Sequence, residues 1–478
     1  MYDFVKTIFY EFQLAIPFGV ICLVIGVVIL AILNWNFRRN GKNLFKWQAA
    51  AILLLLCYLG GLAAITFMNR IDGMRIGLQL YPLLAFWEAW NSFTLQTWLN
   101  PLLNIAMFIP LGVLLPLAAK FFCRWFWTLM MGTGISLGIE LLQYILGRGQ
   151  ADVDDLICNI LGTMLGYCIC LCFINLIRKK WKSAGRNAAF PILFVATLAG
   201  VFLVYRVQPY GNLADAPIYA ANTEGVEWVQ ECELSNEPGL SGVYWAEPLT
   251  KKSCDDFAEE FLERHGSEID SSMTDISYSD NFAFYTDHHT YNLIVSYKDR
   301  SYEYTDYRVD SELRFSENGG GQISEEKLRA AVEKLGIQIP GAAVFSVVDE
   351  ERGTYAFAAN SVVSDNQLID GELTCHVAEG GILYKVDNAL SISDHYADAT
   401  TISSQEAYER LCAGYFSWRD VPAFNYLAPQ KLRVVSCTLG YITDSKGFRQ
   451  PVYYFTISDE NEGEFQNDNS WTTFVPAL

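Results

Sequence analysis

Long apolar runs fill the first 206 positions of the chain, whereas residues 207–478 contain no run of comparable length. Six runs reach 18 residues or more, and they cover residues 14–34, 47–68, 101–119, 125–146, 155–177 and 188–205. That length crosses a hydrocarbon core about 30 Å thick, whereas a helix in a soluble core is shorter and keeps a polar stripe. Residues 1–206 are therefore predicted to form an α-helical polytopic membrane bundle of about six spans, with the lipid bilayer as a partner.

Basic residues between the runs predict the orientation of this bundle. The loops after the first, third and fifth runs hold eleven Lys and Arg residues, whereas the opposite side holds five. Cytoplasmic loops carry the excess of positive charge. The strongest positive charge beside the first run lies after the run. A cleaved signal peptide carries its positive charge before the apolar region, so the first run is expected to be an anchor. We therefore expect a multi-pass protein of the cell membrane with its N-terminus outside and residues 207–478 in the extracytoplasmic space.

Charge divides the chain at the same boundary as hydropathy. The formal net charge of −19 combines +8 over residues 1–206 with −27 over residues 207–478. Phosphate binding requires a basic face, so nucleic acid is excluded as a partner of the acidic part. The chain is expected to consist of a membrane domain and an acidic extracytoplasmic domain.

Short strand-like and helical stretches alternate in residues 207–478, which predicts an α+β domain. The expected strands are 281–285, 291–297, 354–358, 382–386, 433–442 and 451–457. The last two flank a hairpin turn at residues 444–447. Helices are expected over residues 254–265, over 325–335 and from Ser403, each ending at a glycine. This order suggests two or three modules, which distantly resemble PepSY-type regulatory modules and so imply binding or inhibition.

Polar side chains gather between residues 100 and 166, inside or beside three of the apolar runs. An ionisable group within a span costs at least a few kcal/mol and is therefore a functional candidate by default. The ligand-binding candidates are Asn104, Glu140, Gln143, Arg148, Asp152, Asp155 and Asn159. A hairpin that turns near residues 149–150 would place Glu140 level with Asn159, about 10 Å below the outer edge. The spacing predicts a small polar pocket that opens to the outside.

Smaller features of these runs predict how the helices pack. Gly162 and Gly166 form a Gly-x-x-x-Gly pair that permits close approach of two helices. Pro110 and Pro116 are expected to break or kink the third run. Cys168, Cys170 and Cys172 spread around a helix among apolar residues and are interpreted as packing residues, so no metal or other cofactor is assigned.

The ordered string of these polar and small residues resembles the VanZ-like membrane proteins. It comprises Asn104, Phe108-Ile109-Pro110-Leu111-Gly112, Glu140, Gln143, Gly147-Arg148-Gly149, Asp152, Asp154-Asp155, Asn159, Gly162 and Gly166. The resemblance covers residues of about 50–175. It implies a cell-envelope role in a Gram-positive bacterium, because the family is named for a protein linked to resistance to the glycopeptide antibiotic teicoplanin.

Three functions remain open at this point. The pocket could bind the head of a lipid-linked cell-wall precursor or a lipoglycopeptide, with Arg148 pairing with an anionic group. Alternatively, Glu140 and Asp155 could serve as catalytic groups of a membrane enzyme, with Asp152 and Asp154 helping to hold a divalent metal. In a third hypothesis, residues 207–478 act as a sensor that binds an extracytoplasmic protein partner. Binding without catalysis is the leading hypothesis.

Histidines and cysteines of the acidic domain add little chemistry. All five histidines lie there, and the adjacent His288 and His289 are interpreted as a surface loop because neighbouring strand residues point to opposite faces. Cys232 and Cys254 are the pair that the spacing suggests for a disulfide. Motifs of serine hydrolases, zinc proteases and phosphate-binding loops are absent from the sequence.

Overall fold

The chain forms two compact units. A computed structural model describes residues 46–68, 78–147, 151–217, 219–269, 274–278, 281–314, 321–416, 431–459 and 470–478, with a few positions between 24 and 39. The membrane unit comprises Met1–Trp90 with Leu95–Gln208, and the C-terminal unit comprises Asn91–Thr94 with Pro209–Leu478. Each unit is described by itself.

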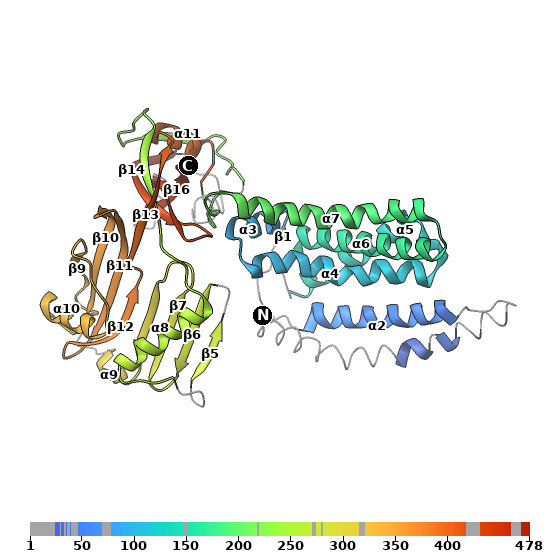
Figure 1. Cartoon of the computed structure of the whole chain (residues 1–478), viewed down its shortest axis with the longest axis horizontal. Helices are drawn as coiled ribbons and strands as arrows, with labels where there is room; N and C mark the ends of the chain where they lie inside the picture. The colour runs from blue at the N-terminus through green and yellow to red at the C-terminus, as the bar shows by residue number, and fades with distance from the viewer. Residues whose placement is uncertain are drawn as a thin grey trace. The chain divides into compact units, whose positions relative to one another are not determined.

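Within the described residues, five helices of the membrane unit are long and apolar enough to span a bilayer. They are α2 (Lys46–Met68), α4 (Leu95–Ala118), α5 (Trp125–Ile145), α6 (Val153–Ile177) and α7 (Trp181–Val207). Figure 1 shows α4, α5, α6 and α7 lying alongside one another. These helices confirm five of the six predicted runs and a multi-pass membrane protein. The first predicted run, residues 14–34, falls mostly outside the described residues.

Glycines bring α4 and α6 into backbone contact. A Cβ atom added to Gly162 would lie 2.0 Å from the carbonyl oxygen of Ile105, and one added to Gly166 would lie 2.0 Å from that of Ile109. In the opposite direction, a Cβ on Gly112 of α4 would meet the carbonyl oxygen of Thr163 at 1.9 Å. The predicted close packing of the Gly-x-x-x-Gly pair is therefore confirmed, because no larger residue fits at these three positions.

Prolines do not interrupt α4. Pro101, Pro110 and Pro116 all lie inside one continuous helix, so the expected break is absent. Membrane helices tolerate proline where neighbouring side chains satisfy freed backbone groups. Tyr58 of α2 contacts α4 close to Pro110, because its hydroxyl donates a hydrogen bond to the carbonyl oxygen of Met107 at 2.7 Å.

Short elements join the turns of the membrane unit. β1 (Leu78–Gln79) pairs in parallel with β2 (Ala151–Asp152), and the short helix α3 (Leu84–Ser92) follows β1. A 3-10 helix, η1 (Lys120–Cys123), connects α4 to α5. The pairing of β1 with β2 attaches the residues directly before α6 to the segment that precedes α3. The sequence pattern did not predict this contact.

The C-terminal unit is built on one sheet of 14 strands, which confirms a mixed helix-and-strand domain. The strands that the sequence predicted are β6 (Phe282–Asp287), β7 (Tyr291–Ser296), β10 (Thr354–Ser364), β12 (Ile382–Asn388), β14 (Lys431–Thr443) and β15 (Phe448–Asp459). The others are β3 (Glu227–Gln230), β4 (Gly239–Trp245), β5 (Asp275–Tyr278), β8 (Tyr302–Asp306), β9 (Val344–Asp349), β11 (Gln367–Ala378), β13 (Ser391–Thr401) and β16 (Ser470–Pro476). Their order is β3-β14-β15-β4-β13-β11-β12-β8-β7-β6-β5, with β10 and β9 added beside β11 and β16 beside β15.

Helices cover this sheet and bury its apolar residues. The helices are α8 (Lys251–Arg264), α9 (Ser311–Arg314), α10 (Glu325–Lys334) and α11 (Ser404–Cys412). Leu262 of α8 and Leu328 of α10 share one core with Leu293 of β7 and Phe357 of β10, and all four are fully buried. Leu411 of α11 belongs to a second core over β14 and β15. In Figure 1, α8 lies against β6 and β7, and α10 lies beside β9–β12.

Local signals explain where these helices begin. Ser403 accepts a hydrogen bond from the backbone nitrogen of Glu406 at 3.0 Å, so the predicted cap of α11 is confirmed. The helix predicted from residue 254 starts earlier, because Thr250 and Ser253 form a reciprocal capping box before α8. Gly266, Gly336 and Gly414 follow the three helices with positive φ, as expected for helix termination.

A buried carboxylate anchors the start of the C-terminal unit. Asp444, which is fully buried, accepts hydrogen bonds from the backbone nitrogens of Gly211 at 2.6 Å, Lys446 at 2.7 Å and Phe448 at 3.0 Å. The side-chain amide of Gln450 donates to it at 2.6 Å. The hairpin predicted at residues 444–447 is confirmed, and the segment after α7 is fixed to that hairpin.

The suggested disulfide between Cys232 and Cys254 is wrong. Cys254 is fully buried in the core under α8, whereas Cys232 packs against the separate core under α11. Both residues are free cysteines. The spacing argument failed because each residue belongs to a different core of the sheet.

Candidate functional site

A stripe of small and polar residues runs along the buried face of α5. Its buried residues are Thr128, Gly132, Ser136, Glu140 and Gln143, at intervals of three or four positions. Residues spaced in this way share one face of a helix. A membrane helix that served only as an anchor would bury apolar residues here, so this stripe defines the candidate site.

Glu140 contacts the beginning of α6. Its side chain is 6% exposed, and its Oε2 atom accepts a hydrogen bond from the backbone nitrogen of Asp152 at 3.2 Å. Asp152 in turn accepts a hydrogen bond from the backbone nitrogen of Asp154 at 2.8 Å and so caps α6. The two predicted residues are therefore brought together at the α5–α6 turn.

Gln143 joins α5 to α2 through only one end of its amide. Its Nε2 atom donates a hydrogen bond to the carbonyl oxygen of Thr66 at 3.1 Å. Because a carbonyl oxygen can only accept, this contact fixes which end of the amide is nitrogen. The side chain is 2% exposed, and its Oε1 atom has no hydrogen-bond partner within the described part of the chain.

Asn159 shows the same arrangement on α6. Its Nδ2 atom donates to the hydroxyl of Ser136 at 3.0 Å, while its buried Oδ1 atom lacks a partner among the residues that the structure describes. Asn159 was expected to lie level with Glu140, but it contacts Ser136, which lies one turn before Glu140 on α5. Extended residues in β2 shift the register from that of a symmetric hairpin.

Asp155 and Asn104 connect α6 to α4. The side-chain amide of Asn104 donates a hydrogen bond to Oδ1 of Asp155, and both residues are half-buried. Asn104 lies more than two turns inside α4, because this helix begins at Leu95. The polar cluster is defined below as the six described candidates: Asn104, Glu140, Gln143, Asp152, Asp155 and Asn159. Arg148, the seventh candidate, lies outside the described residues.

The three aspartates at the start of α6 point to different partners. Asp154 is 2% exposed, and its carboxylate accepts hydrogen bonds from the backbone nitrogens of Leu83 and Ala85 at the start of α3. Asp152 caps its own helix and Asp155 contacts α4. Among the described residues, no group of three or more His, Cys, Asp or Glu is arranged to hold a metal ion. The geometry therefore gives no support to a metal held by these three aspartates.

Asp152 of the polar cluster has carboxylates among its described neighbours. Burial raises the pKa of Asp152; the backbone hydrogen bond from Asp154 opposes this, and the negative charges of Asp154 and Glu88 add to the increase. Each Lys and Arg side chain described in the membrane unit is exposed. Among the residues described at this end, the buried and half-buried charged side chains are carboxylates.

Sequence reasoning missed three contributors to this site. Ser136 and Thr66 contact the cluster amides, and α3 receives the Asp154 carboxylate. Ser136 could have been found, because it lies four residues before Glu140 on the same face of α5. The other two could not, since their contacts join segments distant in sequence.

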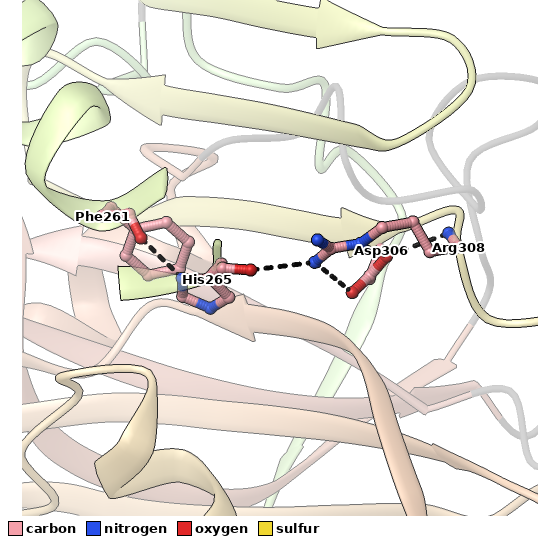
Figure 2. A network of polar contacts seen from close by, with 4 residues as sticks. All are labelled: Phe261, His265, Asp306 and Arg308. Atoms are coloured by element: carbon pink, nitrogen blue, oxygen red, sulfur yellow. Dashed lines mark hydrogen bonds and ion pairs between the residues drawn. The ribbon is translucent and has the colours of Figure 1, made fainter. Parts of the chain in front are cut away.

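In the C-terminal unit, His265 forms a separate polar network (Figure 2). Its Nδ1 atom hydrogen-bonds the carbonyl oxygen of Phe261 at 2.5 Å, and its own carbonyl oxygen accepts from Nη2 of Arg308 at 3.1 Å. Arg308 also pairs with Asp306 at 2.8 Å. The ring stacks on Phe261, and Nε2 is buried without a partner in the described chain. Burial lowers the pKa of His265, because protonated Nε2 would need an acceptor.

An open hollow of about 250 Å³ lies on the sheet of the same unit. It is lined by Phe282, Ile294, Ser301, Tyr302, Glu303, Asp387, Asn388 and Ala389. Lys385 forms ion pairs with Glu303 at 2.9 Å and with Asp387 at 3.4 Å, and His376 contacts Asp387 at 3.3 Å. Burial alone would raise the pKa of Asp387, but His376 and Lys385 outweigh burial and lower it. These carboxylates are therefore balanced by neighbouring cations.

Comparison with protein families gives a match within the membrane unit. The VanZ/LLP1 family model matches residues 20–176, a range that ends within α6 and contains every residue of the polar cluster. The expected resemblance is thereby confirmed for this domain, whereas the resemblance of the C-terminal unit to PepSY-type modules has no support. No curated protein matches the chain.

Proposed function

We propose that the VanZ/LLP1 domain at residues 20–176 binds the polar head of an amphiphile at the polar cluster. The amphiphile would be a lipid-linked cell-wall precursor or a lipoglycopeptide. The observation that carries this proposal is the pair of buried amide oxygens, Gln143 Oε1 and Asn159 Oδ1, that lack partners among the described residues. A ligand that donates hydrogen bonds would satisfy both.

The energetics distinguish a binding role from simple helix packing. A buried polar atom without a partner costs roughly 1–3 kcal/mol, so polar groups that only join helices are normally satisfied at both ends. Gln143 and Asn159 each use their nitrogen to join helices, and within the described chain their oxygens have no hydrogen-bond partner. This half-satisfied arrangement is typical of a site prepared for a further partner.

The acidic C-terminal unit would act on the same side of the membrane as the bound head. In the predicted orientation it lies outside, where it would contact cell-wall material or a protein partner. Its first residues are fixed by Asp444 to the hairpin that follows β14. A link to teicoplanin resistance would follow if the bound ligand were this antibiotic or its target.

Purified full-length protein in detergent tests the proposal. Teicoplanin and lipid-linked wall precursors would be titrated against wild type, Gln143→Leu and Asn159→Leu, and the recovered ligand would be weighed by mass spectrometry. Asn175→Leu is the matched control, because Asn175 lies 16 positions beyond Asn159 on the same helix. We expect saturable binding of unaltered ligand that weakens at least tenfold in both cluster variants only.

Other outcomes would favour the alternatives. Recovery of a ligand with altered mass would identify an enzyme and direct attention to Glu140 and Asp155. Equal binding by wild type and both cluster variants would refute the cluster as the site. In that case, a sensor role of residues 207–478 would become the leading hypothesis.

A further inference from the structure

We propose that the end of the membrane bundle opposite the polar cluster is a binding surface for the head groups of anionic phospholipids. It is formed by η1 and by the turn between α6 and α7. This basic surface comprises six exposed side chains: Lys120, Arg124, Lys179, Lys180, Lys182 and Arg186. Arg124 directly precedes α5, and Gln143 of the polar cluster lies 19 positions later, which corresponds to about 28 Å of helix. The inference is therefore independent of the proposed function.

Helix packing places the two turns at the same end of the bundle. The glycine contacts described above follow the same order along α4 and α6, so these two helices run in the same direction. η1 follows α4, and the α6–α7 turn follows α6. The hydroxyl of Tyr167 on α6 donates a hydrogen bond to the carbonyl oxygen of Cys123 in η1 at 2.8 Å, and the charge of Arg186 acts on the same tyrosine. The basic residues of both turns therefore belong to one surface.

Positive charge on this surface is not balanced by carboxylates of its own segments. The sequence contains no Asp or Glu between Glu88 and Glu140 or between Asp155 and Asp215, and these two intervals hold the whole basic surface. Within the described part of the chain, none of the six side chains forms an ion pair. Arg178, the C-cap of α6, adds a seventh positive charge beside them. An anion bound here would gain attraction from several cations that otherwise repel one another.

Aromatic side chains place the basic surface at the depth of lipid head groups. Phe121, Trp125 and Trp181 are exposed, and each adjoins a basic residue in the chain. They lie at the ends of helices that are long and apolar enough to span a bilayer. Tryptophan gathers at the interface between membrane and water, where the lipid phosphates also lie. A soluble acidic protein would meet the cations from the water side only, whereas a lipid contacts the cations and the aromatic rings together.

The net charge of the head group decides which lipids this surface selects. Groups of four to eight Lys and Arg residues beside a membrane span are typical of anionic lipid recognition, and each cation adds to the attraction. Phosphatidylglycerol carries an unbalanced phosphate, whereas the phosphate of phosphatidylcholine is balanced by its own quaternary ammonium. The basic surface should therefore retain phosphatidylglycerol in preference to phosphatidylcholine.

Native mass spectrometry of the full-length protein from detergent tests this inference. Phosphatidylglycerol and phosphatidylcholine with identical acyl chains would be titrated against wild type and two triple variants. One variant combines Lys179→Gln, Lys180→Gln and Lys182→Gln, and the other combines Lys120→Gln, Arg124→Gln and Arg186→Gln. The control removes the same charge from exposed positions of the C-terminal unit through Lys252→Gln, Lys327→Gln and Lys334→Gln. A fourth protein keeps the charge through Lys179→Arg, Lys180→Arg and Lys182→Arg.

Wild type is expected to bind phosphatidylglycerol at least tenfold more tightly than phosphatidylcholine. Each triple variant of the basic surface should lose most of this preference, whereas the control and the arginine variant should retain it. The preference should also fall as salt is raised, because salt screens exposed charges. Thermal unfolding of each variant in detergent shows that it remains folded.

Three results would overturn the inference. Equal affinity of wild type for the two lipids would refute selection by charge and leave the surface to a soluble acidic partner. A preference that survives both triple variants would place the lipid elsewhere on the protein. Displacement of phosphatidylglycerol by millimolar inorganic phosphate would identify a site for free phosphate in place of a lipid surface.

Discussion

The amide nitrogen of Gln143 donates to the backbone carbonyl of Thr66 at 3.1 Å, and its buried amide oxygen has no partner among the residues that the structure describes. One side chain therefore joins α2 to α5 and offers an acceptor within the bundle. The same division of roles occurs at Asn159, whose nitrogen contacts Ser136. In both amides the nitrogen joins two helices, and the oxygen is the atom proposed to bind the ligand.

Replacement of Gln143 by leucine should separate stability from binding. The variant loses one hydrogen bond, worth about 1 kcal/mol, and also removes an unsatisfied buried oxygen. We expect the thermal midpoint of the protein in detergent to change by less than about 4 °C while ligand binding falls tenfold. A midpoint that collapses together with binding would indicate that Gln143 serves only to hold helices together.

Substitutions of glycine should reveal the close contact of α4 and α6. Gly162→Ala would place a methyl group 2.0 Å from the carbonyl oxygen of Ile105 and should destabilise the bundle by about 2–3 kcal/mol. Gly134→Ala is the control, because a Cβ there has no atom within 4 Å and alanine favours helix. Thermal unfolding followed by tryptophan fluorescence compares the two, and equal midpoints would contradict the packing.

Loss of the Asp444 carboxylate should release the segment that follows α7. Asp444→Ala removes four hydrogen bonds at a fully buried position and should destabilise the C-terminal unit by about 3 kcal/mol or more. Asp444→Asn should also destabilise the C-terminal unit, because the amide NH₂ would replace an accepting oxygen and face N–H donors. Limited proteolysis near residue 212 measures the release, and Asp365→Ala at an exposed turn is the control. Unchanged cleavage in Asp444→Ala would refute the anchor.

His265 should make the stability of the C-terminal unit dependent on pH. Burial lowers its pKa in the folded state, so the unfolded chain, with a histidine pKa of about 6.5, takes up the proton first. Stability is therefore retained above pH of about 6.5 and lost as the pH falls below it. His265→Phe should reduce the dependence of the thermal midpoint on pH between pH 5 and pH 7, whereas the exposed control His289→Gln should leave this dependence unchanged. Parallel pH profiles for all three proteins would contradict this account.

Hydrophobic patterning predicted the helices of the membrane unit well, because span length is a local property. Five predicted runs are membrane-length helices, and the spacing of Glu140 and Gln143 placed both on one buried face. The same reasoning predicted the cap of α11 at Ser403 and the hairpin at Asp444, which depend on neighbouring residues only.

Contacts between segments distant in the chain could not be predicted from the sequence. The pairing of β1 with β2, the capping of α3 by Asp154 and the role of Thr66 each join residues about 70 positions apart or more. The level of Asn159 was misjudged because the turn contains extended residues. The supposed pair of Cys232 and Cys254 failed for a similar reason, since the long sheet divides the C-terminal unit into separate cores.

The most direct test of the account is ligand recovery from the purified full-length protein. Wild type, Gln143→Leu, Asn159→Leu and Asn175→Leu would be exposed to the same mixture of wall precursors and teicoplanin and examined by native mass spectrometry. The account predicts that wild type and Asn175→Leu retain an intact amphiphile and that both cluster variants lose it while staying folded. Equal retention by all four proteins would contradict the proposed binding site.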